Sequence, residues 1–439
     1  MIEKILEEAR RRVGGVEVYY EESEERSVRF KANSLHSMNA KETSGVGLRV
    51  IHKGRVGFSS SMDLSESNWI VDKALESSEF GQEAKFSFPT SVGAGLKPAP
   101  TVKVNSDEVR NFPPEKGIEM GKEILDEILS RNPEIKIDFI IEKEISKIRV
   151  LNTQGLDLSY EGTGFSWIIE GLLIVDGSFL WITEGKGSCR LVNEMKPFVD
   201  RFLWKADLAK KVSSVKTKKM PVLFMPWALP TLLSAFDLSL NGKTLVKGSS
   251  PLLNRKGEKI LDERVTLLDD GTLDYGLGSA PFDGEGIATQ RKVLFEKGVL
   301  KGYLFDLQTA VMMEEEPTGN GERGFSSLPS PGRTNFLLEP GMKMTQEMIE
   351  EIEEGIIVYE VIGGGQSNLL AGDFSLNVSL GFKIERGEIA GRVKDVMVSG
   401  NVYSAFNRIR EIGSEVEDVF TLYSPPILFD DLNVTSQEG

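Results

Sequence analysis

Cysteine and histidine are almost absent from this 439-residue chain, which contains one cysteine and two histidines. Cys189 has no second thiol with which to form an internal disulfide, and a lone cysteine is typical of a reducing compartment. Neither histidine is near Cys189 in the sequence, so we interpret its thiol as structural. His36 and His52 have no second ligand at helical spacing, which argues against a histidine-based zinc site. No Gly-x-Ser-x-Gly motif is present, so a Ser-His-Asp hydrolase is not indicated.

Long apolar runs are also missing. No apolar run reaches about 18 residues, the length that a membrane-spanning helix requires. The N-terminus places Ile2, Ile5, Leu6 and Ala9 among Glu and Arg residues, a pattern typical of an amphipathic helix and not of a signal peptide. Together with the lone thiol, these absences predict a cytoplasmic protein.

Asp and Glu outnumber Lys and Arg, so the formal net charge is -15. Such a surface repels phosphate backbones, which disfavours direct nucleic-acid binding. The nearest approach to a basic cluster runs from Lys210 to Lys219, but it has no aromatic side chains to stack on bases. We interpret it as a solvated connector.

The residues that are present indicate an α+β fold, with mixed and antiparallel sheets, flanking helices and a strand-rich C-terminal domain. The length predicts two or three domains. Residues 88–100 are rich in Pro, Gly, Ala and Ser, and mark the first boundary. We therefore predict an N-terminal α+β domain (1–95), a middle α+β domain (100–215) and a C-terminal strand-rich domain (220–439).

Hydrophobic periodicity predicts the individual elements. Residues 16–61 indicate strands with a hairpin turn at His52-Lys53-Gly54, and a helix capped by Ser65 or Ser67 follows. The other expected helices are 114–130, 197–210, 228–240 and 345–353. The other expected strands are 135–141, 147–151, 156–160, 165–175, 222–225, 292–295, 299–305, 334–338, 356–362, 379–385 and 392–398.

Two acidic clusters and a glycine run are candidate ligand sites. Asp269-Asp270, and Asp283 with Glu285, have the oxygen ligands that Mg²⁺ and Ca²⁺ prefer, but the glycines beside them favour turns. Gly363 to Gly365 follow a predicted strand as a phosphate loop does, yet no Lys-Ser/Thr pair follows them. Three successive glycines instead favour the close approach of another backbone.

Several blocks of sequence resemble a known family. Asp283-Gly284-Glu285-Gly286-Ile287-Ala288-Thr289-Gln290-Arg291 and Gly298-Val299-Leu300-Lys301-Gly302-Tyr303-Leu304-Phe305-Asp306 are similar to the central signature of TldD/PmbA proteins, also called modulators of DNA gyrase. The blocks Arg333 to Gly341, Gly363 to Asn368, Gly372 to Ser375 and Gly45 to Phe58 resemble further family blocks. The resemblance covers nearly the whole chain in order.

The resemblance also shows what this chain lacks. TldD, the family's active partner, carries a His-Glu-x-x-x-His helix and a late cysteine as its zinc site, and this helix corresponds to Ser234-Ala235-Phe236-Asp237-Leu238-Ser239. Serine is a poor zinc ligand, and Ala235 has no carboxylate to act as a general base. No thiol appears between Glu411 and the end of the chain. The resemblance therefore implies a PmbA/TldE-type subunit without catalytic or metal-binding residues.

The function implied by the resemblance is that of a non-catalytic subunit in a TldD-like zinc metallopeptidase that acts on unfolded or leader peptides. We expect no cofactor in this chain, zinc in a TldD-like partner, and a dimer formed with that partner or with a second copy. Arg333, Asn335, Gly363, Gly364 and Gly365 are candidates for binding an extended peptide by strand addition. The alternatives are a non-enzymatic modulator of a toxin, antitoxin or gyrase-related protein, and a homodimer with activity of its own.

Overall fold

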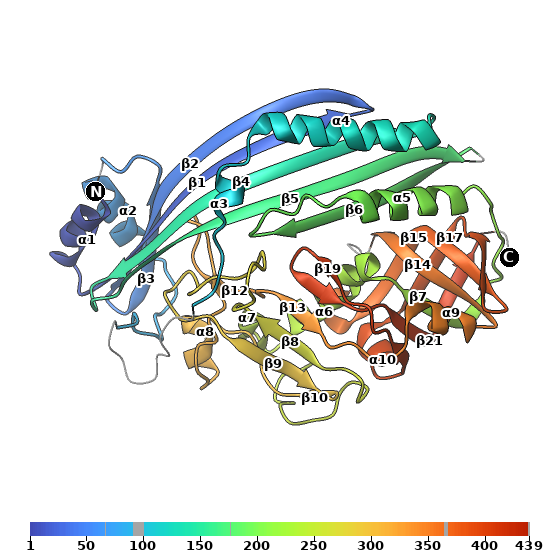
Figure 1. Ribbon diagram of the computed structural model, residues 1–439. Coiled ribbons are helices and arrows are strands. Elements are labelled where there is room, and N and C mark those ends of the chain that lie inside the picture. The colour runs from blue at the N-terminus through green and yellow to red at the C-terminus, as the bar shows by residue number, and fades with distance from the viewer. Residues whose placement is uncertain (66, 91–100, 176, 364–367, 438–439) are drawn as a thin grey trace.

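The computed structural model describes residues 1–65, 67–90, 101–175, 177–363 and 368–437, and Figure 1 shows their arrangement. A long curved sheet spans the molecule, and two smaller sheets lie below it in this view. Strands cluster in antiparallel pairs with helices around them, which confirms the predicted α+β class. No helix in the described ranges is long and apolar enough to cross a bilayer.

The long sheet has six antiparallel strands in the order β3-β2-β1-β4-β5-β6. The turn between β2 and β3 has Lys53 at φ 50° and Gly54 at φ 76°. Two positive φ values in succession are typical of a type I′ hairpin turn, so the predicted hairpin is confirmed. The strand bounds are β1 (Gly15–Lys31), β2 (Ser34–His52), β3 (Arg55–Ser61), β4 (Lys136–Asn152), β5 (Asp157–Val175) and β6 (Ser178–Ser188).

Helices pack against both ends of the long sheet. At the N-terminal end, α1 and α2 bury Ile5, Ile70 and Val71 against β1 to β3. Toward the other end, α4 packs on β1 and β4, and α5 packs on β6. Apolar residues recur every three or four positions in these helices, so each has one face to bury. The bounds are α1 (Ile2–Arg10), α2 (Ser67–Ser78), α3 (Asp107–Arg110), α4 (Pro114–Arg131) and α5 (Lys196–Leu208).

The C-terminal region contains two main sheets. One has the order β10-β9-β8-β13-β20-β19. The other has the order β14-β7-β21-β17-β15-β16, and because β15 also pairs with β14, five of its strands close into a ring. The strands are β7 (Lys218–Phe224), β8 (Leu267–Asp270), β9 (Arg291–Glu296), β10 (Val299–Leu300), β11 (Gly321–Glu322), β12 (Ser330–Pro331), β13 (Phe336–Leu338), β14 (Glu354–Gly363), β15 (Asp373–Glu385), β16 (Glu388–Arg392), β17 (Val396–Asn401), β18 (Ile409–Ile412), β19 (Glu417–Val419), β20 (Leu422–Ser424) and β21 (Ile427–Ser436).

A large apolar core joins these C-terminal sheets. Its centre includes Phe224, Phe236 and Phe295, each fully buried. Helix α6 crosses this core and brings Phe236 between the rings of Phe295 and Phe406. The helices of this region are α6 (Leu229–Ser239), α7 (Gly242–Val246), α8 (Leu307–Met312), α9 (Thr345–Glu350) and α10 (Val402–Phe406), with short 3-10 turns η1 (Pro226–Ala228) and η2 (Leu369–Ala371).

Some predicted elements are wrong in their bounds. The strands expected at 135–141 and 147–151 are the single strand β4, and those at 156–160 and 165–175 are the single strand β5. Strand β6 was not predicted, and the strand expected at 392–398 is interrupted, because β16 ends at Arg392 and β17 begins at Val396. The strand expected at 299–305 extends only from Val299 to Leu300.

The segments 1–95 and 100–215, predicted as separate domains, contribute to one continuous sheet. Strand β1 pairs with β4 from Glu17 opposite Asn152 to Phe30 opposite Phe139. Most of the expected boundary at 88–100 lies outside the described residues, which resume at Thr101.

Candidate functional site

Helix α6 contains the positions at which the resemblance places a catalytic metal site. Ser234 Oγ donates to Thr231 O at 2.6 Å, so this hydroxyl is used within the helix. Ala235 and Ser239 are fully buried. The Tyr403 side chain of α10 lies beside them, with its hydroxyl 3.5 Å from Ala235 O and 3.2 Å from Leu370 O. The face of α6 that carries Ala235 and Ser239 is therefore packed against other parts of the protein.

The residues on α6 do not fit a zinc ion. Zinc requires imidazole, thiolate or carboxylate ligands, and Ser234, Ala235 and Ser239 supply none of them. Within the described ranges, no group of three or more His, Cys, Asp and Glu side chains is placed to hold a metal ion. Cys189 is buried, and its Sγ donates to Gly276 O at 3.2 Å. The expectation that this chain binds no zinc stays a prediction for metal analysis.

Arg333, one of the candidate peptide-binding residues, contacts α6. Its Nε is 3.2 Å from Asp237 Oδ2, and both side chains are a little over one quarter exposed. Its guanidinium also stacks on the Phe336 ring, with the centroid 5.2 Å away. Burial raises the pKa of Asp237 to about 6, although the charge of Arg333 opposes this shift. The pair is accessible at the surface, where a bound molecule can contact it.

Asn335 lies in a different environment from Arg333. Its side chain is fully buried, where Nδ2 donates to Asp270 O and Ser279 Oγ, and Oδ1 accepts from Gly278 N. These contacts hold the 271–280 loop in place. Peptide binding by Asn335 stays a prediction, and its burial does not favour that role.

Gly363, the first residue of the glycine run, lies on the ring of strands. Gly363 ends β14 with φ 110°, a backbone angle that glycine adopts without strain, and pairs with Leu376 of β15. Gly364 and Gly365 lie outside the described residues. The role of these glycines in binding an extended peptide by strand addition stays a prediction.

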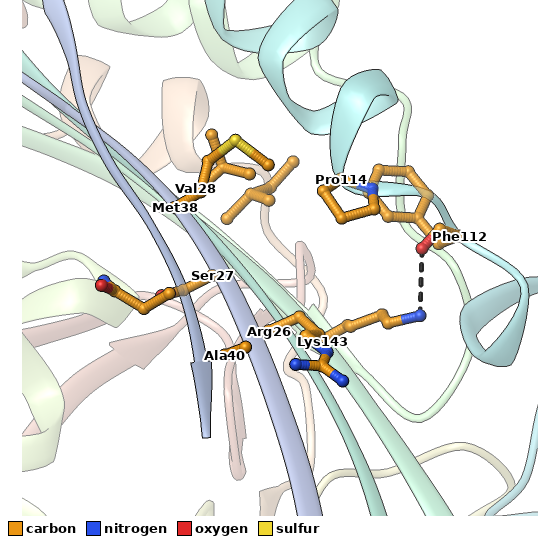
Figure 2. A pocket seen from close by; sticks show the side chains of 10 residues that line it. Arg26, Ser27, Val28, Met38, Ala40, Phe112, Pro114 and Lys143 are labelled. Carbon is orange, nitrogen blue, oxygen red and sulfur yellow. Dashed lines mark hydrogen bonds between the residues drawn. The ribbon is translucent and has the colours of Figure 1, made fainter. Parts of the chain in front are cut away.

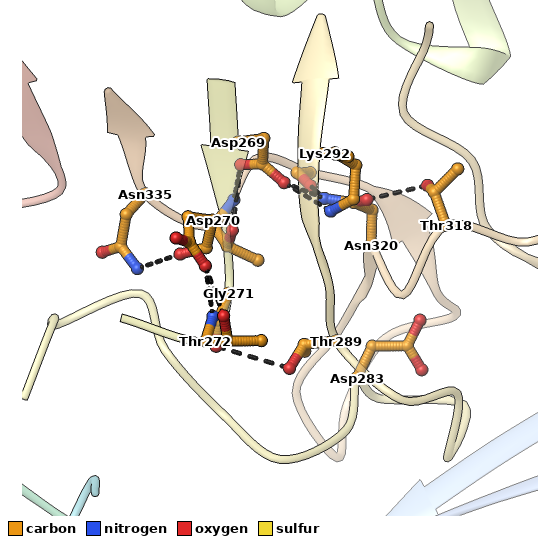
Figure 3. A network of polar contacts seen from close by, with 12 residues as sticks. Asp269, Asp270, Gly271, Thr272, Asp283, Thr289, Lys292, Thr318, Asn320 and Asn335 are labelled. Atoms are coloured by element: carbon orange, nitrogen blue, oxygen red, sulfur yellow. Dashed lines mark hydrogen bonds and ion pairs between the residues drawn. The ribbon is translucent and has the colours of Figure 1, made fainter. Parts of the chain in front are cut away.

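The aspartates at 269 and 270 belong to a polar network within the fold. Asp269 is fully buried and accepts hydrogen bonds from Lys292 and Asn320 (Figure 3). The backbone N–H and the hydroxyl of Thr334 also donate to Asp269. Asp270 accepts from the backbone and hydroxyl of Thr272. Four protein donors surround Asp269 and Lys292 neutralises its charge, so the structure explains these carboxylates without a cation.

A second buried cluster joins the long sheet to the C-terminal region. Arg49 on β2 donates to Glu17 of β1 at 2.9 Å and to Glu285 at 2.6 Å. Arg323 donates to the other oxygen of Glu17 at 2.7 Å and stacks on the Tyr19 ring at 4.7 Å. All four ionic side chains are at most 3 % exposed. We call Glu17, Arg49, Glu285 and Arg323 the seam cluster.

Asp283 adds a third buried carboxylate beside the two of the seam cluster. Burial raises the pKa of Glu285 to about 7 and that of Asp283 to about 6. Asp283 accepts from the backbone N–H groups of Glu285, Ile287 and Gly321. Glu285 also accepts from Leu307 N at the start of α8. These signature residues are therefore used to hold loops and sheets together.

A cavity of about 200 Å³ lies between the seam cluster and Arg333. Its walls include the aromatic residues Tyr19, Tyr160 and Phe282, several backbone glycines, and both Arg323 and Arg333. The rings of Tyr160 and Phe282 meet edge to face at 5.1 Å. Among the described residues, Nε and Nη2 of Arg323 have no hydrogen-bond partner. Sequence reasoning missed this cavity, because its residues come from β1, β4, β5, β11 and several separate loops.

Comparisons with known proteins assign the family. Residues 217–436 match the model of the PmbA/TldA metallopeptidase C-terminal domain, and residues 16–78 match domain 1 of the same metallopeptidases. An uncharacterized protein of Methanocaldococcus jannaschii is 31 % identical over 98 % of both chains.

Solved structures share the whole fold. TldE from Thermococcus kodakarensis is 24 % identical, with a TM-score of 0.89 over 99 % of each chain. A Thermotoga maritima protein described as a candidate modulator of a DNA gyrase is 25 % identical, with a TM-score of 0.88 over 99 % of each chain. The present chain belongs to the PmbA/TldD family of metallopeptidases.

Proposed function

We propose that this chain is the non-catalytic, PmbA/TldE-type subunit of a two-chain metallopeptidase, whose zinc and general base belong to a TldD-like partner. The observation that carries the proposal is the composition of α6. The chain has Ser234, Ala235 and Ser239 where the resemblance places two histidines and a glutamate. We place the assembly in the cytoplasm, because a single free cysteine is typical of a reducing compartment.

Burial on α6 supports this proposal. A metal site that hydrolyses peptides needs an open coordination position and a path for water. Ala235 and Ser239 are fully enclosed, and Tyr403 lies between α6 and η2. Unfolded or leader peptides are the substrate class we propose for the assembly, and the Arg333–Asp237 pair is the candidate contact on this chain.

The mechanism assigned to this chain is restricted to binding and orientation. Arg333 can donate to a peptide carbonyl or carboxylate from its accessible side while its Nε stays near Asp237. A strand edge can add an extended peptide by main-chain hydrogen bonds, which bind without sequence preference. No proton transfer or nucleophilic step is assigned to a residue of this chain.

A mixing experiment tests the proposal. The purified chain, a purified TldD-like chain from the same organism, and their mixture are assayed with an unfolded casein substrate. We expect cleavage by the mixture only, and an Arg333→Ala variant should weaken substrate binding in the mixture more than Lys73→Ala, a surface control on α2. Stoichiometric zinc in the pure chain together with cleavage by that chain alone would refute the proposal.

The competing function is a non-enzymatic modulator, which the description of the Thermotoga maritima relative favours. A modulator with a net charge of -15 would repel DNA, so we expect its partner to be a protein. The same experiment separates the two functions, because a modulator would bind its partner without any cleavage by the mixture.

A further inference from the structure

Side chains from three neighbouring strands of the long sheet form a small array on one of its faces. Two successive rows of this array, each read across β2, β1 and β4, are Met38, Val28 and Ile141, and Ala40, Arg26 and Lys143. The irregular step in the β1–β2 pairing lies outside these rows, between Arg29 and Phe30. Residues two positions apart in a strand point to the same face, so an apolar row lies directly beside a row with two cations.

The array lines one side of a groove of about 280 Å³. Pro114, at the start of α4, and Phe112, just before it, line the other side. Figure 2 shows Met38 and Val28 across the groove from Pro114, and Lys143 beside Phe112. Met38 is 49 % exposed, so a ligand can reach the groove. A cavity of about 150 Å³ can hold benzene, so this groove has room for a short apolar chain.

Lys143 has a hydrogen-bond donor to spare in this groove. Its Nζ donates to Arg110 O at 2.9 Å and to Phe112 O at 3.0 Å. An ammonium group has three donors, so one N–H remains. Burial lowers the pKa of Lys143, although the charge of Glu24 opposes this shift. The protein surroundings therefore replace the water around this cation only in part.

The other cation of the array is already compensated. Arg26 Nε lies 2.9 Å from Glu24 Oε1, and Arg26 Nη2 lies 3.1 Å from Glu42 Oε1. Lys143, in contrast, forms no ion pair with any residue that the structure describes. Of the two cations, Lys143 is therefore the one that a ligand can neutralise.

We propose that this groove binds a small carboxylate with an apolar chain, which packs on the apolar row while the carboxylate accepts the remaining N–H of Lys143. Hydrogen bonds between two charged groups are about twice as strong as neutral ones. The groove shares no residue with α6 or with the cavity beside Arg333, so this inference does not rest on the proposed function.

The size of the groove favours a free small molecule over a peptide. Pockets for drug-sized ligands begin at about 300 Å³, and this groove lies just below that size. A peptide could place only its last residue there. We therefore assign the groove to a free carboxylate and make the peptide a competing ligand in the test.

The test compares three small probes on the full chain. Hexanoate has both features, 1-hexanol lacks the charge, and acetate lacks the chain. Calorimetry gives the affinities, and labelled methionine methyl groups show the place of binding. Met38 is one of 13 methionines, and its signal is the one that disappears in Met38→Leu. We expect hexanoate to shift the Met38 signal and to bind about tenfold tighter than either other probe.

Matched substitutions on β4 test the role of the charge. Lys143→Met should weaken hexanoate about tenfold and leave 1-hexanol unchanged, since the apolar row is intact. The control is Lys136→Met, because Lys136 is exposed on the same strand and points to the opposite face. It should change neither affinity.

A second substitution does not disturb the contacts of Lys143. Met38→Glu places a carboxylate beside the groove at a half-exposed position, so the fold should be preserved. Repulsion should weaken the binding of hexanoate more than that of 1-hexanol.

Four results would overturn the proposal. Three of them are hexanoate binding no tighter than 1-hexanol, an unshifted Met38 signal, and equal losses of hexanoate affinity in Lys143→Met and Lys136→Met. The fourth is tighter binding of a tripeptide that ends in leucine, which would assign the groove to the ends of peptides.

Discussion

Arg49 Nη1 lies 2.6 Å from Glu285 Oε1, although 236 residues separate the two in sequence. This contact joins β2 of the long sheet to the most distinctive signature block of the chain. Both side chains are at most 3 % exposed, and Arg49 also binds Glu17. Residues that identify the family are therefore used here as an ionic connection between two regions.

Replacing Arg49 by Met should destabilise the whole chain. At pH 8, above the pKa of Glu285, Glu17 loses one of its two cationic partners and Glu285 loses its own, so buried carboxylates remain uncompensated. Such a loss costs about 3–5 kcal/mol of unfolding free energy. Lys73→Met is the control, because Lys73 pairs with Glu76 at the surface and such pairs contribute about 1 kcal/mol or less. Urea unfolding measures both, and equal effects would contradict the role of the seam cluster.

The seam cluster should also make stability depend on pH. Burial raises the pKa of Glu285 to about 7, so the folded chain takes up a proton that the unfolded chain, with an ordinary carboxyl pKa, has released. The resulting stabilisation is present below the unfolded pKa and is lost as the pH rises through about 7. Glu285→Gln cannot titrate, so its stability relative to the native chain should improve between pH 5 and pH 8. An unchanged difference across this range would contradict the assignment.

Substitution on α6 tests whether its packed face has room for catalytic groups. Ala235→Glu places a carboxylate in a fully buried position beside Tyr403. Overpacking and burial of an unpaired charge should together cost about 3 kcal/mol or more. Leu238→Glu on the same helix is the control, since Leu238 is 42 % exposed and surface changes stay near about 0.5 kcal/mol. Similar melting temperatures for both variants would show that this face is open.

The only thiol should be unreactive in the folded chain. Burial, with a further contribution from the charge of Glu144, raises the pKa of Cys189 to about 11, and little thiolate is present at pH 8. A thiol reagent should modify the native protein slowly and the urea-unfolded protein at once. Rapid modification of native protein, with no loss of structure, would show that Cys189 is accessible.

The strand-rich architecture could be predicted from the sequence, but the continuity of its strands could not. Glu142-Lys143-Glu144 has the polar character of a loop, yet it lies inside β4, because β1 and β5 satisfy its backbone on both sides. Likewise, β5 continues through Glu161-Gly162-Thr163-Gly164. Local composition does not reveal such pairing, since the partner strand is far away in sequence.

The candidate site was only partly accessible to sequence reasoning. The family resemblance places the metal ligands and the general base at Ser234, Ala235 and Ser239, which cannot serve as either, and the structure adds that two of the three are buried. The seam cluster was missed, although Glu17 between Val16 and Val18, and Arg49 between Leu48 and Val50, place charges within apolar runs. Successive side chains of a strand point to opposite faces of the sheet, so each of these charges lies on the other face from its apolar neighbours. A charge within an apolar run of a strand therefore indicates a second buried interface.

Elemental analysis shows whether this chain holds zinc by itself. The chain is purified alone, and again in complex with a TldD-like subunit, without chelators, and zinc per chain is measured by mass spectrometry after dialysis. We predict less than about one tenth of a zinc ion per chain for the protein alone and one per heterodimer for the complex. One tightly held zinc ion per chain in the pure protein, retained after dialysis, would mean that this chain has a metal site of its own.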